Sequence, residues 1–271
     1  MKIAITGGSG FLGQAAVRYA QEAGHEAWAF DRADGNDILG SLEGLRDADI
    51  VIHLAGMLGT SELFDEVEKA VQVNVIGTTR ILDWCRDNSA GYVGIGMPPV
   101  FPSVYTATKV CATRLATAYH VAYGVPVSHV RAFNAYGPGQ KYGPGHPQKI
   151  VPTFARYAWE GRPLPIWGDG EQTTDLVHTD DVARMLVDAA GHGDDVTFDA
   201  GTGVAVTVNE LASFVLDATG SKGGVEHLPM RIGETPTLIV AQGEGWDRLD
   251  WKPTHDWSKV GDTVEWYRDN T

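Results

Sequence analysis

The sequence predicts an α/β fold in which helices cover a doubly wound parallel sheet, followed by a smaller C-terminal α/β lobe. The first third of the chain alternates short apolar runs with amphipathic stretches, as repeated βαβ units do. A glycine-rich turn, GGSGFLG, stands between the first apolar run and the first amphipathic stretch. The length of 271 residues suits one large domain or two closely packed lobes.

The elements of the first part follow in a regular order. Apolar runs predict strands at 2–6, 26–31, 48–56 and 91–96. Helical patterns cover 11–24, 62–87 and 103–123, and the last of these ends at Gly124. Residues 125–139 are typical of a strand that runs into a turn. Strands and helices that alternate in this way build a parallel sheet with helices on its faces.

The alternation of strand and helix patterns stops near residue 138, where the sequence reads GPGQKYGPGHPQK. A loop this rich in glycine and proline is more typical of a lid or a binding loop than of a domain linker. Further elements are expected at 151–160, 164–168, 175–191, 196–201 and 207–219. We predict that residues 1–137 form the first domain, that 171–200 pack back onto it, and that 138–170 and 201–271 form the smaller lobe.

Composition excludes several classes of protein. Thirty-five acidic residues against twenty-one basic ones give a formal charge of -14, which repels nucleic acid and anionic membrane surfaces. No apolar run approaches the length of a membrane span, and the opening MKIAIT has no signal-peptide pattern. We therefore expect a cytoplasmic protein without nucleic-acid or membrane partners.

Cysteine and histidine spacing gives no sign of a disulfide framework or a metal centre. Cys85 and Cys111 lack a short-spaced ligand motif. None of the nine histidines pairs with another at metal-ligand spacing beside a carboxylate set. His53 on an apolar strand and His178 after DLV are expected to be structural histidines. No metal is expected.

The glycine-rich turn predicts a dinucleotide site. Gly7, Gly10 and Gly13 follow a strand and open a helix with G-x-x-G-x-x-G spacing, which lets backbone N–H groups approach a pyrophosphate. Asp31 closes the second strand, where its carboxylate can accept hydrogen bonds from an adenosine ribose and would repel a 2′-phosphate. This pattern favours a Rossmann-type domain that binds NAD rather than NADP, although the neighbouring Arg32 weakens that preference.

A second pattern suits proton transfer. Tyr105 and Lys109 stand four residues apart, so they share one face of a helix. A nearby ammonium should lower the pKa of the tyrosine, and a phenolate can remove a proton from an alcohol as hydride leaves the same carbon. Alone, Y-x-x-x-K is usually a solvated helix face.

The ordered set of motifs closely resembles the extended short-chain dehydrogenase/reductase family, in its NAD-dependent epimerase/dehydratase branch that modifies nucleotide sugars. The motifs are GGSGFLG, Asp31, HLAG, VNVIGT, YTATK, RAFNAYGPG, GDGEQTTDLVHTDDVA, FDAGTG and RLDWKP. The resemblance covers nearly the whole chain. It implies NAD as cofactor and a nucleotide sugar as substrate.

By this resemblance, each matching position has an expected role at the cofactor. The expected phosphate contacts are Gly7, Gly10, Phe11, Leu12 and Gly13. The further cofactor contacts are Asp31 at the adenosine ribose, Asp37 and Ile38 at adenine, Leu54, Ala55 and Gly56 along the cofactor path, and Asn74. Lys109 would bond the nicotinamide ribose while Tyr105 acts as acid and base. Asn74 could instead only cap a turn.

The resemblance also implies substrate contacts in and near the smaller lobe. Asn134 matches a family residue near a substrate phosphate, and Arg231 in MRIGE is a candidate for the diphosphate. Independently of the resemblance, Trp167 in PIWGDG could border a nucleotide base. Asn134 could instead cap a turn, and Arg231 could be a surface charge. The two helices at 62–87 and 104–123 commonly pair across a dimer interface in this family, so a homodimer is expected.

One departure concerns charge at the diphosphate. The family often reads Q-T-R-D-F, with the arginine on the nucleotide diphosphate, where this chain has Thr174. The glycine- and proline-rich loop carries Lys141, His146 and Lys149, which could supply the missing charge. The ordinary alternative is that these are solvated residues of an exposed loop.

A second departure concerns the strand before Tyr105. The family places a Ser or Thr at its end, whereas Gly94–Met97 offer no side-chain hydroxyl, and Ser103 is expected to cap the next helix. A backbone N–H, a water or a residue from elsewhere must replace the hydroxyl, or the oxidation step is weak.

The same stretch helps to choose among reactions. Dehydratases of the family need an Asp-Glu pair, and decarboxylases a Glu, where this chain has Met97, Pro98 and Pro99. These residues disfavour both reactions and favour epimerisation through a transient ketone. The alternatives are a ketosugar reductase that uses NAD(P)H and a homologue that binds NAD or nucleotide sugars without turnover.

Overall fold

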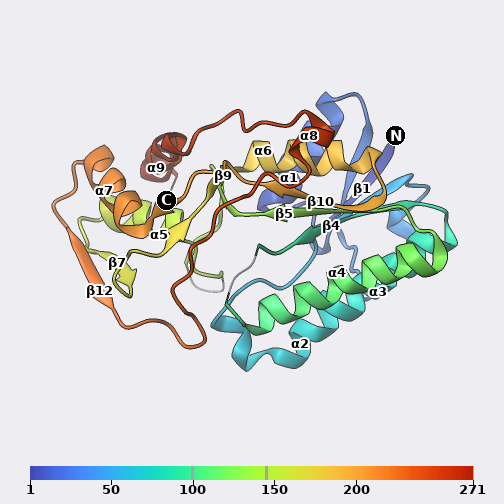
Figure 1. Ribbon diagram of the computed structural model, residues 1–271, viewed down its shortest axis with the longest axis horizontal. Coiled ribbons are helices and arrows are strands. Elements are labelled where there is room, and N and C mark those ends of the chain that lie inside the picture. The colour runs from blue at the N-terminus through green and yellow to red at the C-terminus, as the bar shows by residue number, and fades with distance from the viewer. Residues whose placement is uncertain (99–100, 144–145, 271) are drawn as a thin grey trace.

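Six parallel strands form the large sheet at the centre of the molecule (Figure 1). The computed structural model describes residues 1–98, 101–143 and 146–270. In spatial order the strands are β10 (Asp194–Ala200), β5 (Val127–Ala132), β4 (Gly91–Gly96), β3 (Ile50–His53), β1 (Lys2–Thr6) and β2 (Glu26–Phe30). The winding reverses between β1 and β3, and doubly wound sheets bind ligands outside such a reversal point. The predicted fold class is confirmed.

Helices cover both faces of this sheet (Figure 1). On one face α1 (Phe11–Glu22) packs beside α6 (Thr179–Asp188), and on the other α3 (Gly77–Asp87) packs beside α4 (Val104–Tyr123). The alternation along β1 explains both cores, because successive side chains point to opposite faces. Ile3 and Ile5 pack in the core beneath α1 and α6, while Ala4 packs in the core beneath α3 and α4.

The start and end of α4 follow from its sequence. The hydroxyl of Ser103 accepts a hydrogen bond from the Thr106 backbone N–H at 3.1 Å, so the expected helix cap is confirmed. Gly124 ends the helix with a φ of 70°, a conformation that glycine adopts without strain. The turn of α4 that carries Tyr105 is therefore defined by local sequence.

The helical pattern at 62–87 is not one helix, and in that respect the prediction was wrong. It comprises η3 (Glu62–Asp65), α2 (Val67–Val71), the π-helical turn η4 (Gln72–Ile76) and α3. Glu66 leaves helical geometry with a φ of -127°, which separates η3 from α2. The wide π turn contains Asn74, whose side chain joins two other segments.

A smaller group of elements builds a second core beside the carboxyl ends of the large sheet's strands (Figure 1). It comprises α5 (Ile150–Trp159), β7 (Leu164–Trp167), α7 (Val208–Thr219), β12 (Val225–Leu228) and α9 (Val260–Asp269). The strands β7 and β12 pair in parallel, and a capping box formed by Thr207 and Glu210 begins α7.

The remaining elements are short. They are β6 (Asn134–Tyr136), β8 (Thr173–Thr174), β9 (Leu176–His178), β11 (Val206–Thr207), α8 (Trp246–Leu249), η1 (Arg32–Asp34), η2 (Glu43–Leu45), η5 (Ala189–Gly191) and η6 (Trp257–Lys259). The tail crosses back over the large core, where Ala241 and Trp251 are buried. The proposed boundaries at residues 137, 170 and 200 remain a prediction. Among the described residues, no helix is long and apolar enough to cross a membrane.

Candidate active site

The turn after β1 has the shape that a dinucleotide pyrophosphate requires. Gly7 has a φ of 71°, and a Cβ at this position would lie 2.8 Å from the backbone nitrogen of Ala55. A Cβ at Gly13 would overlap the Gly7 carbonyl oxygen, so glycine is needed for α1 to approach the turn. Gly10 is the N-cap residue of α1, and Phe11 and Leu12 lie in the first turn of this helix. The predicted phosphate residues thus lie together at a helix N-terminus, which fits an anion.

Asp31 lies beside this turn, at the end of β2. Its carboxylate accepts hydrogen bonds from the backbone N–H groups of Ser9 at 3.2 Å and Ala33 at 3.0 Å. Asp31 therefore caps η1 and touches the glycine-rich turn at the same time. Contact between Asp31 and an adenosine ribose stays a prediction.

The two residues expected at adenine follow on the next loop. Asp37 accepts a hydrogen bond from the Leu39 backbone N–H at 2.9 Å and is otherwise exposed. Ile38 is buried, and its side chain packs against Gly77 at the start of α3. The structure therefore leaves the Asp37 carboxylate accessible and uses Ile38 to anchor the loop.

Asn74 joins the loop after β3, which contains residues 54–56, to the N-terminal part of α4. Its Oδ1 accepts a hydrogen bond from the Met57 N–H at 2.7 Å, and its Nδ2 donates to Met57 O and Thr108 Oγ1, both at 3.0 Å. The Thr108 hydroxyl in turn donates to the Tyr105 carbonyl oxygen at 2.9 Å. The amide therefore positions the loop that contains residues 54–56 against α4. Direct contact between Asn74 and the cofactor stays a prediction.

A buried network under this loop includes residues that the sequence did not single out. His53 Nδ1 lies 2.7 Å from Thr6 Oγ1, and His53 Nε2 lies 3.1 Å from Thr78 Oγ1. Thr6 Oγ1 also accepts a hydrogen bond from the Ala55 N–H at 3.2 Å. Burial, together with the charge of Lys109, lowers the pKa of His53 to about 3, so its imidazole is neutral. The expectation of a structural histidine is confirmed.

Tyr105 and Lys109 lie one turn apart on α4, as predicted. Neither the phenol nor the ammonium makes a hydrogen bond or ion pair to any residue that the structure describes. Lys109 is 6% exposed, and burial lowers its pKa to about 8. Burial also raises the pKa of Tyr105 above its usual range. The predicted lowering of the tyrosine pKa is therefore wrong here, because burial disfavours the charged phenolate.

The end of β4 supplies neither a hydroxyl nor a carboxylate. A Cβ at Gly94 would lie 2.7 Å from the Tyr92 ring, so the buried tyrosine on the same strand requires glycine there. Met97 and Pro98 follow, and Pro99 lies outside the described residues. Ser103 is committed to the helix cap. The substitute for the family hydroxyl does not come from this strand's described side chains.

Two of the predicted substrate residues contact each other. The guanidinium of Arg231 lies 4.9 Å from the centroid of the Trp167 ring and forms an ion pair with Glu234 at 2.5 Å. The Thr60 hydroxyl donates a hydrogen bond to the same carboxylate at 2.6 Å. Glu234 therefore connects Arg231 to the loop that follows residues 54–56.

Lys149 stands near this group. Its side chain is half-buried and makes no hydrogen bond or ion pair within the described parts of the chain. Burial lowers its pKa, and Arg231 lowers it further, while Glu62 opposes the shift. Lys149, Arg231, Glu62 and Glu234 thus form one charged group in which Arg231 stacks on Trp167, and the Lys149 ammonium has no partner among the described residues.

Asn134 lies on the short strand β6, beside the residue that replaces the family arginine. Its amide donates a hydrogen bond to the hydroxyl of Thr174, and its backbone N–H donates to Asp175 O at 2.9 Å. Asn134 is exposed, whereas Thr174 is buried. The structure therefore brings Asn134 and Thr174 together and keeps Thr174 from solvent.

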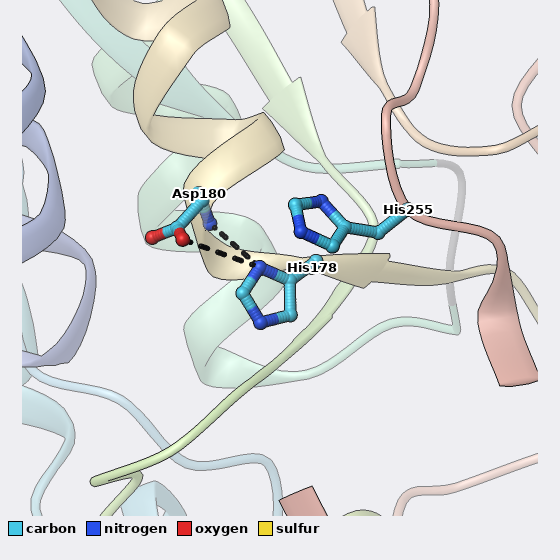
Figure 2. A group of neighbouring side chains, drawn as sticks. All are labelled: His178, Asp180 and His255. Atoms are coloured by element: carbon cyan, nitrogen blue, oxygen red, sulfur yellow. Dashed lines mark hydrogen bonds and ion pairs between the residues drawn. The ribbon is translucent and has the colours of Figure 1, made fainter. Parts of the chain in front are cut away.

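The described residues contain one group with metal-ligand chemistry, namely His178, Asp180 and His255 (Figure 2). Asp180 forms an ion pair with Arg18, and the His255 Nδ1 lies 2.9 Å from the buried Asp181 carboxylate. The two imidazole rings stack with centroids 4.2 Å apart and planes 26° apart, so their in-plane lone pairs do not converge on one point. The group fastens the tail to α6. The expectation of no metal stays a prediction.

Comparison with known proteins places the chain among enzymes of nucleotide-sugar metabolism. UDP-glucose 4-epimerase from Mycolicibacterium smegmatis is 27% identical, and the alignment covers 100% of both chains. A dTDP-glucose 4,6-dehydratase from Streptomyces antibioticus is 28% identical over 100% of this chain and 93% of its own length.

Solved structures agree with these relatives. DesIV, a dTDP-glucose 4,6-dehydratase from Streptomyces venezuelae solved with NAD bound, superposes with a TM-score of 0.88 at 26% identity. The match covers 100% of this chain and 98% of that one. The model of the NAD dependent epimerase/dehydratase family matches residues 3–96 and 97–201, and the chain therefore belongs to this family of NAD-dependent extended short-chain dehydrogenase/reductase enzymes.

Proposed function

We propose that the protein epimerises a nucleotide-activated sugar through a transient keto intermediate. The observation that carries this proposal is the pair of Tyr105 and Lys109, whose polar groups are unpaired within the described structure. Their helix is tied to the loop after β3 through Asn74 and Thr108. The end of β4 adds no described carboxylate next to them. Reversible oxidation needs one acid–base group and a hydride acceptor, whereas elimination of water needs further acid–base groups.

Each group of the proposed site has one task in this chemistry. NAD, when bound along the glycine-rich turn, supplies a hydride acceptor and later the hydride donor. Tyr105, acting as the phenolate, takes at its Oη the proton of the reacting sugar hydroxyl as its carbon is oxidised, and the Lys109 ammonium offsets part of the burial that otherwise holds the Tyr105 pKa high. Once the keto sugar has rotated in the site, the opposite face of its carbonyl group is reduced. Tyr105 then returns the proton to the carbonyl oxygen. The sugar changes configuration with no net oxidation.

The charged group around Trp167 is our proposed site for the nucleotide diphosphate. Lys149 offers an ammonium without a described partner, and Arg231 can exchange the Glu234 carboxylate for a phosphate. A bidentate guanidinium suits both anions, so the exchange keeps the same geometry. Asn134 lies on the strand beside Thr174 and can donate to a phosphate oxygen. These cations compensate for the family arginine that Thr174 replaces.

The decisive experiment examines the purified protein directly. We expect its ultraviolet spectrum to show bound NAD, and NMR of a panel of UDP-, dTDP-, GDP- and CDP-sugars to show one sugar converted to its epimer without net redox change. Net NADPH consumption with a ketosugar would replace epimerisation by reduction. Bound NAD with no conversion of any sugar in the panel would favour a binding protein without turnover.

We also propose a homodimer that forms through the face made by α2, η4 and α4, which contact one another; α2 and α4 lie together in Figure 1. Large apolar side chains are exposed on these elements, namely Val67, Val71, Ile76, Val110 and Val121. Exposed apolar side chains on helices that pack together are typical of a protein interface. Light scattering should give twice the mass of one chain, and a monomeric mass would contradict this proposal.

A further inference from the structure

We propose that Asp34 makes the protein selective for NAD against NADP, in addition to the role expected of Asp31. The proposal rests on NAD as the family cofactor bound along the glycine-rich turn. It resolves a conflict in the sequence, because Asp31 disfavours a 2′-phosphate while the neighbouring Arg32 would attract one.

Two carboxylates converge on Ser9 of the glycine-rich turn. Asp31 Oδ2 accepts a hydrogen bond from the Ser9 backbone N–H at 3.2 Å, and Asp34 Oδ2 accepts one from the Ser9 hydroxyl at 2.8 Å. One oxygen of each carboxylate is therefore within reach of a single residue. A phosphate attached to a ribose at Asp31 would face both carboxylates.

The short connection after β2 holds Asp34 in this place. Asp31 Oδ1 accepts the Ala33 N–H at 3.0 Å, and the Asp34 N–H donates to Asp31 O at 2.9 Å. Gly35 ends the turn with a φ of 80°, and the Asn36 N–H returns to Asp31 O at 2.9 Å. Asp34 therefore lies over Ser9 because one tight turn is closed by three hydrogen bonds to Asp31.

The basic residue of this turn does not neutralise the two acids. Arg32 is exposed and forms no ion pair with Asp31 or Asp34. A ribose 2′-hydroxyl can donate a hydrogen bond to a carboxylate, whereas a 2′-phosphate carries negative charge that both carboxylates repel. The Asp34 carboxylate thus adds to the discrimination between NAD and NADP without a contact to the ribose 2′-hydroxyl of NAD.

The test measures binding rather than turnover, so it does not depend on which reaction the protein catalyses. Isothermal titration calorimetry on nucleotide-stripped protein gives the dissociation constants of NAD and NADP for the parent chain, Asp34→Asn and Glu43→Gln. Glu43 is an exposed acid in η2, and its substitution removes the same charge without any contact to Ser9. Asp34 is also exposed, so its substitution should not prevent folding.

We expect Asp34→Asn to reduce the preference for NAD about tenfold by tightening NADP binding, and Glu43→Gln to leave the preference unchanged. Ser9→Ala, which keeps both charges, should retain the preference. An unchanged preference in Asp34→Asn, or an equal change in Glu43→Gln, would overturn the proposal. If the parent chain bound no NAD at all, the cofactor assignment itself would fail, which is a different result from an unchanged ratio.

Discussion

The cofactor half and the substrate half of the proposed site are held together by different interactions. In the cofactor half, His53 and Asn74 are buried, and their ring nitrogens and amide atoms are hydrogen-bonded within the protein. In the substrate half, Arg231 and Glu234 are half-buried residues on a loop and hold each other as an ion pair. A buried satisfied network tolerates little change, whereas a paired charge on a loop can exchange its partner.

This difference indicates in which half of the site residues can be substituted. The cofactor half must accept one molecule that is common to the whole family, so its glycines and buried amides are constrained by backbone contacts. The substrate half has to fit one sugar nucleotide among many, and loop charges provide that choice at small cost in stability. The following substitutions test this division.

The largest effect is expected at the acid–base residue. Tyr105→Phe should lower turnover about a thousandfold, because the phenyl ring cannot accept or return the proton. Folding and NAD binding should persist, since the phenol makes no hydrogen bond to a described residue. Tyr123→Phe, on the exposed end of α4, is the matched control and should keep full activity. Unchanged turnover in Tyr105→Phe would exclude the proposed mechanism.

The buried ammonium of Lys109 is expected to lower the free energy of unfolding while it supports turnover. Its pKa is about 8 in the fold against 10.5 in the unfolded chain, so between these values the unfolded chain binds more protons. The cost of the buried ammonium is full below pH 8 and disappears as pH rises towards 10.5. Lys109→Met should raise the free energy of unfolding at pH 7 by about 3 kcal/mol and lower turnover about a hundredfold.

Denaturant unfolding of the protein at several pH values checks this prediction. The parent chain should gain stability from pH 8 to 10.5, and Lys109→Met should lose that part of the gain. Lys69→Met serves as the control, because Lys69 is an exposed lysine on α2 paired with Glu66. A Lys109→Met protein that is less stable at pH 7 would show that the ammonium is not penalised by burial.

Breaking the positioning network should have an intermediate effect. Asn74→Ala leaves the Met57 N–H and carbonyl oxygen without their side-chain partner and should cost about 2 kcal/mol in the free energy of unfolding. Turnover should fall as well, because the loop at 54–56 is no longer tied to α4. Asn88→Ala removes a single hydrogen bond on the exposed end of α3 and should be nearly neutral in thermal unfolding and in activity.

The smallest of these effects is expected in the substrate half. Arg231→Gln should raise KM for the nucleotide sugar about tenfold while NAD binding stays unchanged. Arg162→Gln is a close control, because Arg162 also stacks on an aromatic ring, Tyr157, and pairs with a glutamate. If both substitutions left KM unchanged, Arg231 would be an ordinary surface charge and the diphosphate site would lie elsewhere.

Much of the fold could be predicted because its signals are local. The strand at 2–6, the glycine-rich turn and the capped helix from Ser103 to Gly124 each depend on neighbouring residues, through hydrophobic periodicity, backbone freedom and capping. The pattern at 62–87 was harder, since a helical periodicity does not reveal the break at Glu66 or the π turn around Asn74.

The class of protein, the glycine-rich turn and the spacing of Tyr105 and Lys109 can be read from the amino-acid sequence alone, because each depends on a few consecutive residues. The surroundings of these residues became known from the assembled fold. Thr6 and Thr78 bind the same imidazole although they are far apart in the chain, and burial of the pair reversed the expected pKa shift of Tyr105. Solvent exclusion and contacts between distant segments arise only when the sheet assembles, and no local pattern records them.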